Sequence, residues 1–239
     1  MNNLTNTLQI QLKEKKFLQR LAVYILGLLL CAAGVAFSIN SQLGISPMNS
    51  FPYIISLIIG FDLGMTVIVF MVILVFLQFL ILGKNFKWIN VTQIIFATIF
   101  GYFVDFTRFI LGDFTFPTYI GQLVMMAISF TLIGTGITLY VSAKLVPLPF
   151  EGIVLAIAEK TRWRFPRVMI GTHSLVVTVG VILSFTFLGG LYGVREGTIM
   201  AALMVGKMVA ISRGMLQPFL KNLDTSNSIP EETTEIVTE

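Results

Sequence analysis

The sequence predicts an all-α polytopic membrane protein, on the evidence of its composition, its apolar runs and an internal repeat. Hydrophobic residues make up 56% of the 239 residues and charged residues 12%, whereas a soluble domain carries roughly 25% charged residues. The mean hydropathy is +0.88. So few charged side chains cannot cover a soluble globule of this size, which excludes a soluble enzyme, a nucleic-acid-binding protein and a disordered protein.

The first element is a polar N-terminal segment, residues 1–16, which we expect in the cytoplasm. Leu4, Leu8 and Leu12 recur every four residues, a spacing that favours a short amphipathic helix on the membrane surface. The apolar run that follows is long enough to cross the membrane and shows no cleavage pattern, so we do not expect a removable signal.

Six apolar runs are long enough to cross a hydrocarbon core, which takes about 20 helical residues. They are Phe17–Ser41, Met65–Leu82, Val91–Leu111, Tyr119–Ala143, Val168–Leu188 and Thr198–Leu216. Residues 17–216 are therefore predicted to form a single membrane domain. Residues 217–239 contain five acidic residues and few apolar ones, which predicts a disordered acidic tail in the cytoplasm.

Two further apolar runs, Met48–Gly60 and Phe150–Lys160, are too short to cross. As helices each would be about 17–20 Å long. Each follows a proline, Pro47 or Pro149, and proline suits the first turn of a helix because it has no N–H to satisfy. We expect two short helices that either enter the membrane and return or lie at its interface.

The second half of the sequence repeats the first. A shift of 102 residues, which three inserted residues later change to 105, superimposes glycines, prolines and arginines. The aligned pairs include Gly34 and Gly136, Leu43 and Leu145, Pro47 and Pro149, Ile55 and Ile157, Gly101 and Gly206, and Arg108 and Arg213. This predicts repeats over residues 17–111 and 119–216, each with one long, one short and two long helices.

The number of crossings per repeat decides how the two repeats are oriented. Three crossings make them inverted; if the short helices also cross, four crossings make them parallel. With six spans and a cytoplasmic N-terminus, thirteen basic residues lie inside and two outside, whereas eight spans give eleven and four. Because basic residues concentrate on the cytoplasmic side, we expect six spans, two inverted three-helix repeats and cytoplasmic termini.

Two proline-led motifs resemble those of the bacterial YczE/YyaS/YitT family of integral membrane proteins. The motifs are Leu-Gly-Ile-Ser-Pro-Met-Asn at 43–49 and Leu-Pro-Phe-Glu-Gly at 148–152, and the resemblance extends roughly from Leu21 to Leu216. The first motif often has tryptophan and aspartate in that family where this chain has Met48 and Asn49. The resemblance implies a multi-pass protein of a bacterial plasma membrane, but little about its activity.

The starts of the two short helices are the candidate substrate-binding site. Ser46, Asn49 and Ser50 cluster at the first start, and Glu151 and Gly152 at the second. A helix that starts inside the membrane presents free N–H groups to an anion or a polar substrate. The alternative is that these side chains only cap helices lying at the interface. Glu151, which aligns with Asn49, is either such a cap or a proton or cation site.

Three other residues are candidates for coupling or for an ion pair. His173, in the fifth run, is either a packing residue or a proton relay. Small residues four apart, Ala97 and Gly101 in one half and Ala202 and Gly206 in the other, predict that the third long helix of each repeat packs near the pseudo-twofold axis. Asp105 and Lys207 would then form an ion pair. The alternative is that Asp105 meets Arg108 while Lys207 reaches the cytoplasmic surface.

The predicted function is transport of a small solute or an ion, bound between two half-helices near the midplane. The alternatives are a channel-like pore and a non-transporting accessory or sensor subunit. We expect no enzyme because no catalytic motif is present. Cys31 is the one cysteine and His173 the one histidine, so we expect no metal or cofactor. The expected partners are the lipid bilayer and the solute, not nucleic acid; homo-oligomerisation is left open.

Overall fold

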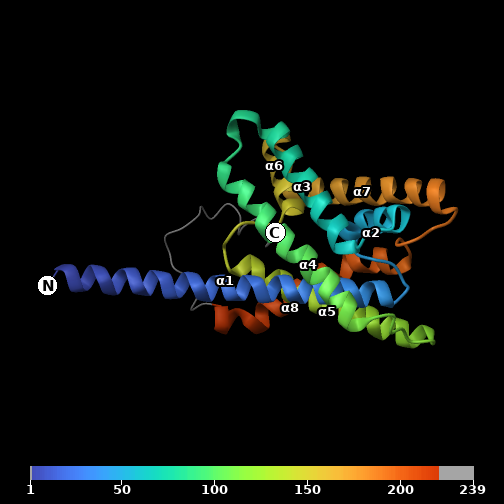
Figure 1. The fold of residues 1–239 in the computed structure, drawn as a ribbon, viewed down its shortest axis with the longest axis horizontal. Coiled ribbons are helices and arrows are strands. Elements are labelled where there is room, and N and C mark those ends of the chain that lie inside the picture. The colour runs from blue at the N-terminus through green and yellow to red at the C-terminus, as the bar shows by residue number, and fades with distance from the viewer. Residues whose placement is uncertain (1, 221–239) are drawn as a thin grey trace.

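The computed structural model describes residues 2–220. All regular secondary structure in this part of the chain is helical (Figure 1). The predicted all-α class is confirmed. Two short 3₁₀ turns, Gly83–Asn85 and Trp88–Thr92, connect α3 to α4. The helices are α1 (Asn2–Asn40), α2 (Pro47–Ile59), α3 (Leu63–Leu82), α4 (Gln93–Leu111), α5 (Tyr119–Ser142), α6 (Pro149–Thr161), α7 (Phe165–Leu188) and α8 (Glu196–Leu220).

Six of these helices are long and apolar enough to cross a membrane, as predicted. The candidate spans have mean hydropathies between 1.6 and 3.0 and contain 21 to 25 residues. The other two, α2 and α6, have 13 residues each and are about 20 Å long at 1.5 Å per residue. Both start at the predicted prolines, Pro47 and Pro149.

The structure corrects two predictions about the ends of the chain. The expected separate surface helix at the N-terminus is wrong, because α1 runs unbroken from Asn2 to Asn40 and extends beyond the other helices (Figure 1). Its 39 residues correspond to about 58 Å, more than one hydrocarbon core. At the other end α8 continues to Leu220, so the tail starts later than residue 217. The remainder of the predicted tail lies outside the described residues.

The centre of the fold is the contact between α1 and α5. A Cβ atom on Gly27 would lie 2.7 Å from the carbonyl oxygen of Gly136, and one on Gly136 would lie 2.6 Å from that of Gly27. Ser129 Oγ donates a hydrogen bond of 2.7 Å to the carbonyl oxygen of Gly34. The absent side chains let the two backbones touch, so the first long helix of each half lies at the centre.

The expectation that the third long helix of each half occupies this central position is therefore wrong. α4 packs on α3 and α1, and α8 packs on α5. The α3–α4 contact depends on Gly64 and Gly101, since a Cβ on either glycine would meet the other's carbonyl oxygen. α7 and α8 make no comparable contact in the described part of the chain.

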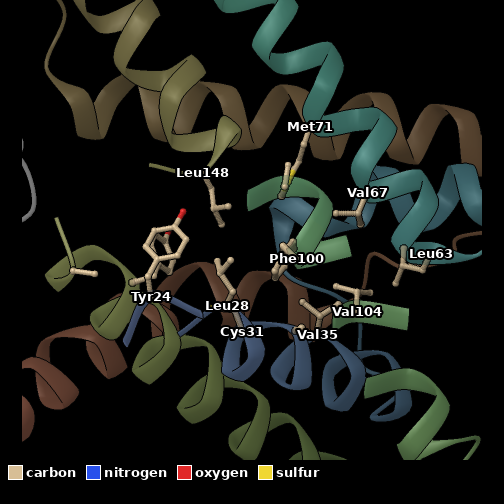
Figure 2. Packing of buried hydrophobic residues seen from close by; sticks show 14 residues of the cluster. Tyr24, Leu28, Cys31, Val35, Leu63, Val67, Met71, Phe100, Val104 and Leu148 are labelled. Carbon is tan, nitrogen blue, oxygen red and sulfur yellow. The ribbon is translucent and has the colours of Figure 1, made fainter. Parts of the chain in front are cut away.

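The short helices fill the spaces between the long ones. Both α2 and α6 pack on α3 and α7. α2 makes its larger contact with α7, and α6 makes its larger contact with α3. A buried cluster joins α1, α3, α4, α5 and the residue that precedes α6 (Figure 2). Its members include Tyr24, Leu28, Val35, Val67, Met71, Phe100, Val104 and Leu148. This apolar cluster fixes the start of α6 against the centre of the bundle.

Candidate functional site

A bent segment leads from α1 into the start of α2. Gln42 and Gly44 have φ angles of 58° and 108°, which turn the chain back towards the bundle. The Ile45 N–H donates to the Gly193 carbonyl (2.9 Å), and the Gly197 N–H donates to the Leu43 carbonyl (2.7 Å). These bonds fix the segment to the connection between α7 and α8.

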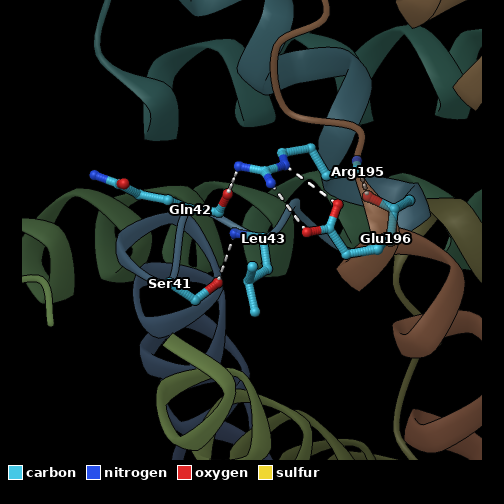
Figure 3. Close-up of polar contacts among 6 residues, drawn as sticks. Ser41, Gln42, Leu43, Arg195 and Glu196 are labelled. Atoms are coloured by element: carbon cyan, nitrogen blue, oxygen red, sulfur yellow. Dashed lines mark hydrogen bonds and ion pairs between the residues drawn. The ribbon is translucent and has the colours of Figure 1, made fainter. Parts of the chain in front are cut away.

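Arg195 reinforces this attachment (Figure 3). Its Nη1 atom donates to the Gln42 carbonyl oxygen (2.9 Å), and its Nη2 atom pairs with Glu196 Oε1 (3.0 Å). Because Gln42 adopts a left-handed conformation, its outward-turned carbonyl needs a donor, and the guanidinium supplies one.

The polar residues predicted at the start of α2 are buried and bond within the first turn of their own helix. Asn49 is 3% exposed and Ser50 is fully buried. Asn49 Nδ2 donates to Ser46 Oγ (2.9 Å), and Ser50 Oγ donates to the Pro47 carbonyl (2.8 Å). Ser46 is the N-cap residue, but its side chain makes no capping bond to the helix. The three side chains thus form a small polar group inside the bundle.

The start of α6 carries a carboxyl group with one unsatisfied oxygen. Tyr140 Oη, from α5, donates to Glu151 Oε1 (3.0 Å). The other oxygen, Oε2, is buried and has no hydrogen-bond partner in the described part of the structure. Burial raises the pKa of the Glu151 carboxyl above its ordinary value, and hydrogen bonds from its own N–H and Tyr140 oppose this shift. An unsatisfied buried acceptor is uncommon and requires an explanation.

Gly152 lies against a buried pair of glutamines. A Cβ atom on Gly152 would lie 2.7 Å from Gln78 Oε1 and 2.9 Å from Gln93 Oε1. Gln78 Nε2 donates to Gln93 Oε1 (3.0 Å) and to the Pro149 carbonyl (3.1 Å). Both glutamines are 1% exposed. α3 and α4 therefore hold the first turn of α6 through these amides, and glycine provides the room for them.

α1 holds the segment between α5 and α6. Arg20 Nε donates to the Ala143 carbonyl (2.7 Å), and Tyr24 Oη donates to the Val146 carbonyl (2.9 Å). The rings of Tyr24 and Tyr140 meet edge to face with centroids 5.8 Å apart. The start of α6 is thus surrounded by side chains from α1, α3, α4 and α5.

An apolar residue at the start of α2 lies against the clusters that hold the start of α6. Met48, at the start of α2, packs against the clusters that contain Leu148 and Phe150. Among the described residues no hydrogen bond connects the polar groups of the two starts. His173 stacks on Phe150 with centroids 4.9 Å apart and an interplanar angle of 17°. The structure thus gives His173 a packing contact and leaves its predicted relay role a hypothesis.

The predicted ion pair between Asp105 and Lys207 is wrong. Asp105 Oδ1 accepts a hydrogen bond of 2.6 Å from the Gly64 N–H at the start of α3. Lys207 is exposed on α8, a helix that packs on α5 rather than on α4. The carboxylate therefore satisfies the N-terminus of a neighbouring helix, where negative charge is favourable.

Sequence patterns did not predict the residues that hold the start of α6 and the segment before it: Arg20, Tyr24, Gln78, Gln93 and Tyr140. One signal was available for Gln78, which interrupts an otherwise apolar run. A polar residue inside a spanning helix usually faces the protein interior. Among the described residues no cluster of histidine, cysteine or carboxylate side chains could hold a metal ion.

Comparison with known proteins places this architecture in a family. The chain is 28% identical over 200 residues to the uncharacterized membrane protein YczE of Bacillus subtilis, covering 83% of this chain and 87% of that protein. It is 24% identical over 189 residues to the uncharacterized protein YyaS of the same organism, covering 79% and 89%. No solved structure matches the chain.

These relatives confirm the resemblance predicted from the two proline-led motifs. The model of DUF6198, a family of unknown function, matches residues 18–214. The matched region contains all six candidate spans apart from the outermost residues of the first and last. The chain therefore belongs to the DUF6198 family of membrane proteins.

Proposed function

We propose that the protein transports a small solute or an ion across a bacterial plasma membrane, with its site at the starts of α2 and α6. The observation that carries this proposal is the buried carboxyl of Glu151, whose Oε2 atom has no partner, at the start of a helix too short to span. Irregular backbone and polar side chains inside a membrane bundle are tolerated where they are buried in protein or line a cavity.

We further propose that the two halves are inverted repeats, as in many secondary transporters. The packing of the helices supports this symmetry, because exchanging α1–α4 with α5–α8 exchanges observed pairs. α1 on α4 corresponds to α5 on α8, and α2 on α7 corresponds to α6 on α3. α2 on α8 likewise corresponds to α6 on α4. An odd number of spans in each half then gives the halves opposite orientations.

Individual residues support the same correspondence at a shift of 102. The non-glycine residues Gln42 and Lys144 both have positive φ angles, one at each turn before a short helix. Gly60 and Arg162, at the C-termini of α2 and α6, also correspond and are both left-handed. The contact between Gly27 and Gly136 has its counterpart between Ser129 and Gly34.

The halves also differ, and this difference supports a moving part. α3 packs closely on α4, whereas the corresponding α7 and α8 make no comparable contact in the described chain. If the close pair and the loose pair exchange roles, the protein has two alternative states. Such an exchange between the two halves is the basis of rocking-type alternating access. The burial of Asn49 and Ser50 and of the Glu151 Oε2 atom favours a closed site over a continuous pore.

The proposed orientation places both termini in the cytoplasm. One open cavity of about 320 Å³ is lined by Asn85, Lys160 and Arg162. The basic segment after α3 and the basic segment at the end of α6 therefore lie at the same end of the bundle. At the other end Asn40 Nδ2 donates to the Gly112 carbonyl (2.8 Å) and Arg195 binds Gln42. Basic residues thus concentrate at one end, which we assign to the cytoplasm.

Transport of a panel of small solutes into proteoliposomes, with and without a proton gradient, tests the function. We expect uptake of at least one solute class by the wild type, and its loss in Asn49→Ala and Glu151→Ala at unchanged protein content. Wild-type rates in both variants would exclude these helix starts as the site. Absence of transport across the whole panel would favour the accessory or sensor role. We expect no hydrolytic or redox turnover of any solute.

A further inference from the structure

Glu151 differs from its counterpart in the first half in a way that packing does not explain. Asn49, at the corresponding position, bonds to Ser46 inside the chain's own turn. Glu151 has the same place at the start of α6, but only Oε1 has a side-chain donor, Tyr140. Oε2 is buried without a partner. An amide would fill similar space without a group that titrates, so the carboxyl introduces chemistry that the first half lacks.

The groups that face Glu151 provide no positive charge to balance a carboxylate. Its titratable neighbours are Tyr24 and Cys31 on α1 and Tyr140 on α5, none of which is a cation. On the same turn of α6, the neutral amides of Gln78 and Gln93 from α3 and α4 lie against Gly152, and His173 of α7 stacks on Phe150. Arg20 directs its guanidinium to backbone carbonyls. No ion pair of Glu151 occurs among the described residues.

A carboxyl in these surroundings is more stable with a proton than without one. An ionised carboxylate in a medium of low polarity needs a cation or several donors, and here it has one tyrosine and its own N–H. A protonated carboxyl instead carries its hydrogen on Oε2, where no donor approaches, while Oε1 continues to accept from Tyr140. The unpartnered oxygen is therefore the expected place of a proton.

We propose that Glu151 is the proton-binding group of the transport cycle, carrying one proton in this closed arrangement and releasing it when the start of α6 opens to water. This inference rests on the proposed transport function. The proton comes from water on the side to which the site was last open and returns to water on the other side. No bond other than O–H forms or breaks.

Infrared difference spectroscopy of the full chain in lipid vesicles tests the protonation without knowledge of the solute. At neutral pH we expect the carbonyl band of a protonated carboxylic acid in the wild type and its loss in Glu151→Gln. Glu159→Gln, an exposed acid on the same helix, is the matched control and should keep the band. A spectrum in which Glu151→Gln removes only carboxylate bands would overturn the proposal.

A second variant keeps the test informative if Glu151→Gln does not fold. Tyr140→Phe removes the donor to Oε1, so the carbonyl band should move to higher frequency; an unchanged band would contradict the assignment.

Proteoliposome uptake separates the two proposals. Uptake that is independent of the proton gradient, and equal in Glu151→Gln, would refute proton coupling but keep transport. The infrared band without any uptake would keep the proton site and refute transport.

Discussion

At the scale of single residues, several polar side chains inside this bundle bond to a neighbouring helix. Asp105 binds the start of α3, and Gln78 binds Gln93 and the start of α6. The residue types at the two short-helix starts could be predicted because a proline-led motif occurs in both halves. Their partners could not, since they come from helices distant in sequence, and apolar periodicity does not specify which helices are neighbours.

The capping role of Asp105 predicts a loss of stability in Asp105→Asn. The change removes the charge that faces the N-terminus of α3 and weakens the bond to the Gly64 N–H, which together should cost about 1 kcal/mol. Asp62→Asn is the matched control, because Asp62 is the N-cap residue of α3 but makes no side-chain capping bond. Thermal unfolding in detergent measures both; equal midpoints for the two variants would contradict this role.

The amide pair predicts that two substitutions together cost less than the first alone. Gln78→Met leaves Gln93 buried without its donor, at a cost of about 1–3 kcal/mol. Gln78→Met with Gln93→Met removes both polar groups and should recover part of the loss, since paired apolar replacements of similar shape are close to neutral. Denaturant titration of the three proteins measures this coupling, and strictly additive losses would refute it.

At the scale of the helices, the structure separates glycines that serve packing from glycines that do not. Gly101 and Gly206 occupy aligned positions in the two repeats, so the sequence alone does not distinguish them. In the structure Gly101 touches Gly64 and Ile68 on α3, whereas Gly206 has nothing within 4 Å. The number and type of the helices could be predicted from apolar run lengths. The difference between the two glycines could not, because it depends on how closely each pair of helices approaches.

This difference predicts opposite effects for one substitution at two aligned positions. Gly101→Ala places a Cβ 2.7 Å from the Gly64 carbonyl oxygen, and such overpacking should cost about 1–3 kcal/mol. Gly206→Ala should be neutral or stabilise by up to about 1 kcal/mol, because alanine favours a helix over glycine. Thermal midpoints of the purified proteins decide. A larger loss at Gly206 would show that this face of α8 is covered.

At the scale of the whole molecule, the proposed transport site depends on the two halves having opposite orientations. The sequence predicted this arrangement from an odd number of spans per repeat and from the distribution of basic residues. The centre of the bundle was predicted wrongly, because small residues four apart occur on several helices. Only the three-dimensional contacts show which pair of helices meets. The contact between α1 and α5 joins the two halves at the centre of the bundle.

Phe61 and Trp163 give the most direct test of this central claim. They correspond at the shift of 102, each follows a short helix, and they are 62% and 65% exposed. In a Cys31→Ser background, an impermeant thiol reagent applied to intact cells should label Phe61→Cys but not Trp163→Cys, while permeabilised cells should show both labelled. Labelling of the two positions from the same side would mean parallel halves and would contradict the inverted arrangement on which the proposed transport site depends.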